Sequence, residues 1–325
     1  LRPKFNFKKL REITKIAVRN LDKIIDINFY PVPEAELSNK RHRPIGVGVQ
    51  GLADVFMAMK LPFDSQEARQ LNYNIFEHMY YAALQESCAL ACNHGSYSSF
   101  DNSPLSNMKL QFDLWDDNSN HKNEGLKDMI TQYEWEELRD EASTGVRNSL
   151  LLAPMPTAST SQVLGNNECF EPYTSNMYTR RTLAGEFPVI NKWLVRDLVN
   201  MGLWNEEMVN RLMYYKGSVE KISKIPQFLR NIYKTAWELK QKVLIDLALD
   251  RGRFICQSQS LNLFFEKPSY QLLSSAQFYG WRKGIKTGSY YIRSQAAVGS
   301  QQFTLDPKIE QKIKEDEGLC EFCSS

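Results

Sequence analysis

Long apolar runs and an excess of charge are both missing from this 325-residue chain. No apolar run approaches the roughly 20 residues that a membrane-spanning helix requires, and the amino terminus is charged rather than signal-like. We therefore expect a cytoplasmic protein that binds no membrane. Forty lysines and arginines stand against 38 aspartates and glutamates, so a net charge of +2 creates no field that would attract nucleic acid.

Cysteine and histidine are scarce, with six and four residues respectively. The cysteines lack the density and even spacing of a disulfide scaffold, so reduced thiols are expected. Cys88 and Cys92 share one helical face, a spacing that suits two metal ligands, but small thiols on a buried stripe explain them better. The histidines stand in unrelated contexts. We predict no histidine catalyst and no metal site in this chain.

The pattern of apolar residues predicts an α/β fold. Helical periodicity covers residues 7–28, 65–94, 189–201, 205–215 and 226–250. Short β-like runs at 44–49, 149–153, 254–265 and 289–293 alternate with these helices. This alternation predicts a mainly parallel sheet or a barrel.

A glycine string between Gly46 and Gly51 matches the G-x-G-x-x-G pattern of dinucleotide-binding folds. In such folds an acidic residue closes a second strand about 20 residues later, whereas here a serine-capped helix start stands in that place. A tight junction between a strand and a helix accounts for the glycines, and we predict that junction.

The segment 153–182 is the most informative part of the chain. Pro154 and Pro156 prevent a helix before them, whereas the hydroxyl residues from Thr157 to Ser161 are typical helix caps. A turn with free N–H groups at a helix N-terminus is suited to binding phosphate. The same pattern also begins ordinary buried helices, so both interpretations are open.

Two adjacent tyrosines, Tyr290 and Tyr291, follow Gly288 in a β-like run. Neighbouring side chains of a regular strand point to opposite faces, which would place one ring in the core and one outside. A bend, which Gly288 could allow, would bring the rings together instead. A stacked pair of phenols could pass a proton and an electron.

Cys320 and Cys323 stand almost at the carboxyl end, after a charged stretch at 306–318 without apolar periodicity. A thioredoxin-type C-x-x-C requires a strand before it and a helix after it, and neither pattern is present. Two thiols on a flexible tether could exchange a disulfide with a buried partner and then with an external reductant. The 28 residues after Tyr291 would span roughly 30 Å as a flexible linker. A frayed terminus with incidental cysteines is the alternative.

Several motifs occur in one order along the chain: RPIGVGVQGLAD at 43–54, PTAST at 156–160, NNE at 166–168, EPYTSN at 171–176, YGW at 279–281, the Tyr290–Tyr291 pair, and the terminal Cys320 and Cys323. Together they resemble the large subunit of class I ribonucleoside-diphosphate reductases of the eukaryotic and viral type. The likeness runs from about Phe7 to the end of the chain.

This resemblance implies a fold in which residues 1–304 form the second half of a ten-stranded α/β barrel with additional carboxyl-terminal helices. Residues 305–325 would form a flexible redox-active tail. The implied reaction is the radical reduction of ribonucleoside diphosphates to deoxyribonucleoside diphosphates. Because the chain begins at Leu1 rather than at Met, we expect a carboxyl-terminal portion of such a subunit.

The resemblance also assigns roles to residues of this chain. The substrate diphosphate would be held by the turn that comprises Pro156, Thr157, Ala158, Ser159 and Thr160. Tyr290 and Tyr291 would relay a radical from the small subunit. Cys320 and Cys323 would re-reduce an active-site disulfide and be recharged by thioredoxin or glutaredoxin.

No cofactor is implied within this chain. The di-iron tyrosyl radical of the family belongs to the small subunit, and the ATP and dNTP effector sites precede this segment in the family. A complete large subunit would form homo-oligomers. None of the six cysteines stands in the family's Asn-x-Cys-x-Glu loop, and Cys169 occupies a position where serine is expected. The alternative function is a non-catalytic docking module, or an inactive remnant, that binds the small subunit.

Overall fold

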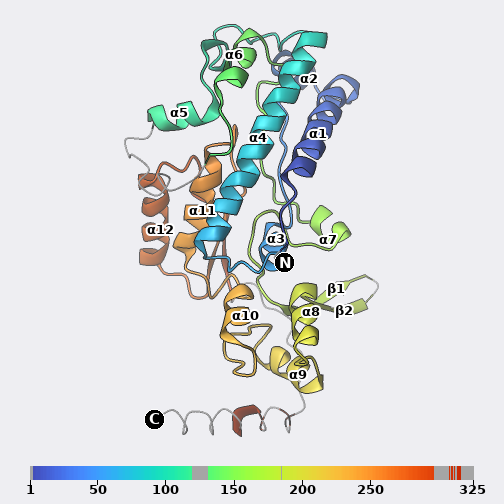
Figure 1. Ribbon diagram of the computed structural model, residues 1–325, viewed down its shortest axis with the longest axis vertical. Helices are drawn as coiled ribbons and strands as arrows, with labels where there is room; N and C mark the ends of the chain where they lie inside the picture. Colours follow the sequence, from blue (N-terminus) through green and yellow to red (C-terminus); the bar gives the residue numbers. More distant parts are fainter. Residues whose placement is uncertain are drawn as a thin grey trace.

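The computed structural model describes residues 3–118, 131–183 and 185–295, with positions 307, 309, 311 and 313–315. These residues combine many helices with two small sheets (Figure 1). The elements in chain order are α1 (Phe7–Ile27), α2 (Pro33–His42), α3 (Leu52–Ala58), α4 (Gln66–His94), η1 (Leu105–Asn107), α5 (Gln111–Asn118), α6 (Glu136–Thr144), α7 (Thr160–Leu164), β1 (Met177–Thr182), β2 (Gly185–Ile190), α8 (Lys192–Asn200), α9 (Glu206–Tyr214), α10 (Gln227–Ile232), α11 (Gln241–Gly252), β3 (Asn262–Phe265), α12 (Tyr270–Arg282) and β4 (Tyr291–Ser294).

The long helices α1 and α4 lie side by side and frame the larger core (Figure 1). Asn6 caps α1 by accepting the N–H of Lys9 at 2.9 Å. Ser65 caps α4 by accepting the N–H of Ala68 at 3.1 Å. At its other end α4 stops at Gly95, which has a φ of 78°. The helices predicted over 7–28 and 65–94 are confirmed. The sequence could predict them because local capping signals mark their ends.

Extended segments at 45–47, 150–154 and 257–262 are joined by backbone hydrogen bonds and cross the larger core. Val47 and Leu152 form a parallel bridge, and β3 pairs in parallel with β4. Parallel neighbours therefore occur as predicted, although only short stretches are regular strand. The described residues form no closed barrel.

The glycines of the G-x-G-x-x-G string mark the predicted strand-to-helix junction. A Cβ atom at Gly48 would lie 2.8 Å from the Cα atom of Pro154, so the neighbouring segment leaves no room for a side chain. Gly51 has a φ of 76° and precedes α3 directly. Close approach and a left-handed turn thus account for these glycines.

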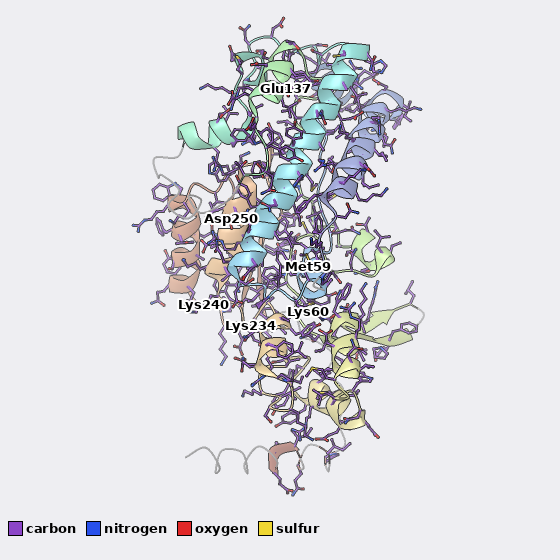
Figure 2. All side chains as sticks on the ribbon, in the orientation of Figure 1. Met59, Lys60, Glu137, Lys234, Lys240 and Asp250 are labelled. Atoms are coloured by element: carbon purple, nitrogen blue, oxygen red, sulfur yellow. The ribbon has the colours of Figure 1, made fainter. Side chains whose placement is uncertain are left out.

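A second, smaller core lies among α8, α9 and α10. Two ion pairs join this part to the larger one. Lys60, which follows α3, pairs with Asp197 of α8, and Lys234 pairs with Asp64 at 2.8 Å. Figure 2 labels both lysines at the junction between the two parts.

The single helix predicted over 226–250 is wrong. Two helices, α10 and α11, are separated by residues 233–240, whose backbone groups bond to another segment. Asn176 donates to the carbonyl of Tyr233 at 2.8 Å, and Ala236 donates its N–H to the carbonyl of Tyr173 at 2.8 Å. These long-range bonds replace helical ones, which the local pattern cannot reveal.

The helix predicted over 189–201 begins later, at Lys192. Val189 and Ile190 belong to β2, which pairs with β1 in an antiparallel hairpin. Asn191 then caps α8 by accepting the N–H of Trp193 at 3.0 Å. The apolar pattern is continuous across this boundary, so only the asparagine cap marks the true start.

None of the helices in the described ranges combines the length and the apolar character that crossing a membrane demands. At the few described positions between 307 and 315 the backbone is helical, and Ile313 is buried. Cys320 and Cys323 lie outside the described residues.

Candidate functional site

The turn predicted to bind phosphate comprises residues 156–160 and is called the phosphate turn below. It is exposed from Ala158 to Thr160 and leads into the short helix α7. Thr157 has a φ of 56°, a left-handed conformation that is rare for a β-branched residue. Its hydroxyl accepts the N–H of Cys169 at 2.8 Å, and its carbonyl accepts the N–H of Ser161 at 3.0 Å. Bonds from both sides therefore hold the turn in this unusual shape.

Three successive backbone N–H groups of the turn are free. Within the described residues, the amides of Ala158, Ser159 and Thr160 have no hydrogen-bond partner. Ser159 is the N-cap of α7, but its side chain makes no capping bond. The turn thus presents three amides and the Ser159 hydroxyl, groups that can donate hydrogen bonds to an anion.

Unpaired polar atoms surround the turn as well. Among the described residues, Gln50 Nε2, Ser161 Oγ and Asn166 Oδ1 are buried without a hydrogen-bond partner. Gln50 is attached to the turn, because its Oε1 accepts the Thr160 hydroxyl at 2.9 Å. Buried polar atoms are nearly always paired, so this cluster is typical of a site that a polar ligand completes.

Tyr290 and Tyr291 lie where β4 begins, and their rings are in contact. The ring centroids are 4.3 Å apart and the planes meet at 61°. The rings are therefore together, as a bend would allow, but the pair is edge-to-face and not stacked. The side chains are 53% and 54% exposed. Hydrogen bonding to the Tyr291 phenol raises the pKa of Tyr290.

Gly288 lies in a bend, as the sequence allowed. It does not have a positive φ. A Cβ atom there would instead collide with the side chain of Gln277 on α12, which donates to Ser289 Oγ at 3.0 Å. The backbone bends at residues 286–288 and again at Tyr290, whose N–H donates to the Leu261 carbonyl at 2.6 Å.

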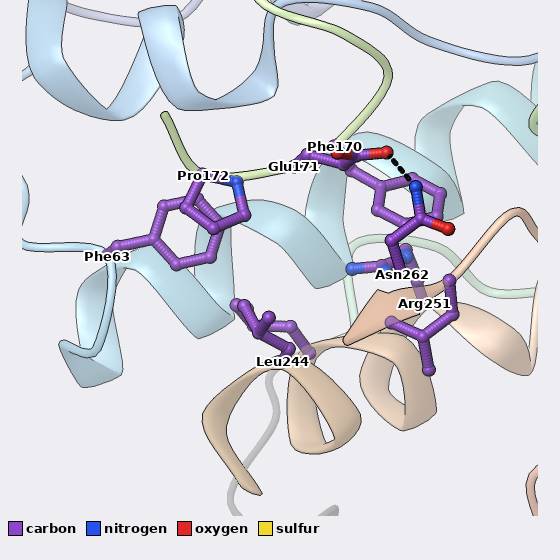
Figure 3. A pocket seen from close by; sticks show the side chains of 9 residues that line it. Phe63, Phe170, Glu171, Pro172, Leu244, Arg251 and Asn262 are labelled. Carbon is purple, nitrogen blue, oxygen red and sulfur yellow. Dashed lines mark hydrogen bonds between the residues drawn. The ribbon is translucent and has the colours of Figure 1, made fainter. Parts of the chain in front are cut away.

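A buried carboxyl group is connected to the tyrosine pair. Asn262 donates from Nδ2 to Glu171 Oε1 at 2.6 Å, and its Oδ1 accepts the N–H of Tyr291 at 3.0 Å. Figure 3 shows the bond between Glu171 and Asn262 at the edge of a small cavity. The cavity has a volume of about 10 Å³ and is lined also by Phe170 and Arg251. The Arg251 guanidinium carbon lies 3.6 Å from the centre of the Phe170 ring.

Burial dominates the electrostatics of this carboxyl group. Glu171 is only 5% exposed, and burial raises its pKa to about 7, although the positive charge of Arg293 and the bond from Asn262 oppose the shift. Burial lowers the pKa of Arg251 to about 9. Glu171 therefore titrates near neutral pH.

Residues 2–291 match the family model described as ribonucleotide reductase, barrel domain. The chain belongs to this family. The resemblance inferred from the motifs is thereby confirmed. The described residues contain no cluster of three side chains that could hold a metal ion.

The chain is similar to proteins from distant organisms. It is 55% identical over 305 residues to the ribonucleoside-diphosphate reductase large chain of Schizosaccharomyces pombe, a match that covers 94% of this chain and 36% of the yeast protein. It is 55% identical over 319 residues to the large subunit of Plasmodium falciparum, covering 97% of this chain and 38% of the relative. Identity to the monkeypox virus large subunit is 53% over 323 residues, covering 99% and 40% respectively. The chain thus spans less than half the length of these relatives.

The turn and the tyrosine pair can be picked out from sequence motifs, whereas no motif predicts a role for Glu171 or Asn262. Glu171 belongs to the EPYTSN motif, and Asn262 lies 91 positions further along the chain. The one sequence signal is that Glu171 stands between Phe170 and Pro172, two apolar residues that suggest a buried position.

The pH dependence of stability should reveal the Glu171 carboxyl. Its folded pKa of about 7 lies above its ordinary value of 4.5, so its contribution to stability is full below pH 4.5 and is lost as pH rises through 7. Glu171→Gln cannot ionise. From pH 5 to pH 8.5, the free energy of unfolding of the wild type, measured with urea, should fall by roughly 2 to 3 kcal/mol relative to that of Glu171→Gln.

Glu266→Gln, at an exposed carboxyl group, is the matched control and should not show this shift. An unchanged difference between wild type and Glu171→Gln at the two pH values would mean that the buried carboxyl does not titrate in this range.

Proposed function

We propose that the chain is the carboxyl-terminal portion of a ribonucleotide reductase large subunit. The complete protein would reduce ribonucleoside diphosphates to deoxyribonucleoside diphosphates by radical chemistry. In this proposal residues 1–304 supply the second half of a ten-stranded α/β barrel, and residues 305–325 supply the tail. The observation that carries the proposal is the contact of Tyr290 with Tyr291, with ring centroids 4.3 Å apart.

The tyrosine pair acts as a relay. A phenoxyl radical on one tyrosine takes a hydrogen atom from the other, so one O–H bond breaks as another forms. The ring contact supports this step, because hydrogen-atom transfer requires the two groups to be adjacent. Both side chains are about half exposed, and a radical at that position needs a partner surface that excludes water. That partner would be the small subunit, whose di-iron tyrosyl radical starts the relay.

The phosphate turn binds the substrate diphosphate. Three free amides and the Ser159 hydroxyl support this role, since each can donate to a phosphate oxygen. The Thr157–Cys169 bond keeps the turn in shape before substrate arrives. Effector nucleotides would bind in parts of the large subunit outside this chain.

The tail carries reducing equivalents. Cys320 and Cys323 would reduce a disulfide formed in each turnover and then exchange with thioredoxin or glutaredoxin. No metal or other cofactor is assigned to this chain, and large subunits would associate as homo-oligomers.

A docking module without chemistry is the second candidate. It is favoured by exposed aromatic side chains on α12, where Phe278 and Trp281 are 60% and 69% exposed. A binding measurement between this chain and a small subunit does not separate the two functions, because both require that binding. Turnover that depends on the Tyr290 hydroxyl separates them, because a docking module needs no phenol.

The phosphate turn can be tested by removing its free hydroxyl in a complete large subunit. Ser159→Ala should weaken binding of a ribonucleoside diphosphate by about 1 to 3 kcal/mol, because it loses a bond to a charged group. Binding of the unphosphorylated nucleoside should stay unchanged. Calorimetry with both ligands makes the comparison.

Val163→Ala, at an 85% exposed position of α7, is the control and should alter neither affinity. Equal losses for the diphosphate and the nucleoside would show that the turn does not read phosphate.

A further inference from the structure

Asn262 is oriented by its two hydrogen-bond partners. A carboxamide has one donor end and one acceptor end. Glu171 offers Asn262 a carboxyl oxygen that can accept whether or not the group is ionised, and Asn262 directs its NH₂ group toward that oxygen at 2.6 Å. The oxygen is then left to receive the N–H of Tyr291 at 3.0 Å. Without Glu171 the carboxamide would be free to turn and to present a donor to the Tyr291 N–H.

The bond to Tyr291 is placed at the bend that brings the two rings together. The N–H of Tyr290 is held by the Leu261 carbonyl at 2.6 Å, and the next N–H is held by the side chain of Asn262. Two consecutive amides are thus fixed by consecutive residues of the neighbouring segment. Loss of the second bond would let β4 relax toward the regular alternation that separates neighbouring side chains.

Glu171 itself is held firmly on the loop that supports the phosphate turn. Its carbonyl accepts from Asn167 Nδ2 at 2.6 Å, and its N–H donates to the Glu168 carbonyl at 3.0 Å. Two residues earlier, Cys169 donates to Thr157 of the turn. The same loop therefore touches both the proposed substrate site and the proposed relay.

We propose that Glu171 is a positioning residue for the Tyr290–Tyr291 pair and acts through Asn262. This inference rests on the proposed function, in which the pair relays a radical. The charged groups that face Glu171 are Arg293 of β4, Glu168 of its own loop and Arg251 of α11. None of them forms a hydrogen bond to its carboxyl group among the described residues.

The test uses a complete large subunit that carries this segment, together with its small subunit. In Glu171→Ala, the Tyr291 amide should exchange with deuterium at least tenfold faster than in wild type. The kcat should fall at least tenfold while KM for the diphosphate stays within twofold, because the relay and not substrate binding is disturbed. Glu171→Gln keeps an acceptor for Asn262 and should restore both values to within threefold of wild type.

Glu77→Gln is the matched control. Glu77 is another fully buried carboxyl group, on α4, and accepts the N–H of Gln132 at 3.0 Å. It should leave the exchange rate of Tyr291 and the kcat within twofold of wild type. Equal acceleration by Glu77→Gln would overturn the proposal, because general destabilisation would then explain the effect.

If Glu171→Ala does not fold, Asn262→Ala tests the same hydrogen-bond chain. A Tyr291 amide that exchanges with deuterium at the wild-type rate in Asn262→Ala would overturn the proposal. Failure of the positioning role is distinct from failure of the proposed function. In the first case Tyr290→Phe abolishes turnover but Glu171→Ala leaves exchange and kcat unchanged. In the second case Tyr290→Phe itself turns over normally.

Discussion

Tyr290→Phe or Tyr291→Phe in a complete large subunit is expected to abolish turnover, leaving less than about one thousandth of the wild-type rate. Each substitution removes a single oxygen, and the rings keep their edge-to-face contact. The phenol O–H is the bond that breaks and forms in the relay, and phenylalanine has none. Fold and substrate affinity should therefore stay almost unchanged.

Deoxynucleotide formation with the small subunit, measured beside diphosphate affinity, checks this prediction. Tyr270→Phe is the control, because this tyrosine of α12 is 86% exposed and has no place in the proposed relay. Near-normal turnover in either relay variant would exclude a hydrogen-atom pathway through the pair.

Cys320→Ser or Cys323→Ser is expected to leave about one turnover from the prereduced enzyme, after which thioredoxin no longer sustains the reaction. A bulky protein reductant cannot reach a buried disulfide, whereas a tethered dithiol can enter the site and then move out for exchange. Dithiothreitol diffuses in without help, so it should restore multiple turnovers to both variants. Shortening 306–318 should reproduce the defect, since a shorter tether does not reach the site.

Turnovers per enzyme, counted with each reductant, provide the measurement. Cys92→Ser, at an exposed cysteine of α4, is the control and should cycle normally with thioredoxin. Sustained thioredoxin-driven cycling after loss of Cys320 or Cys323 would identify the tail as an ordinary chain terminus.

The sequence predicted those parts of the fold that local signals define. The helix α4 is an example, because Ser65 and Gly95 mark its ends and its apolar stripe fills the space between them. The junction at Gly46 to Gly51 was predictable for the same reason, since glycines mark a close approach and a left-handed turn. The break between α10 and α11 was not, because it depends on bonds from Asn176 and Ala236 to distant residues.

Some features of the candidate site could likewise be predicted from the sequence, whereas others could not. The phosphate turn could be predicted because its prolines stand next to a run of hydroxyl residues. The tyrosine pair could be predicted because two adjacent tyrosines form a distinctive motif. The edge-to-face angle of the rings and the Glu171–Asn262 bond depend on how separate segments pack. No spacing rule links residues 171, 262 and 291, so their connection could be found only in three dimensions.

The proposed function depends most on the transfer of a radical through this chain. The decisive measurement places 3-aminotyrosine, which is oxidised more easily than tyrosine, at position 290 or 291 of a complete large subunit and records electron paramagnetic resonance spectra after mixing with small subunit and substrate. We expect an aminotyrosyl radical at each position, with a matching loss of the small-subunit radical. A small-subunit radical that persists undiminished, with no aminotyrosyl signal at either position, would contradict radical transfer through Tyr290 and Tyr291.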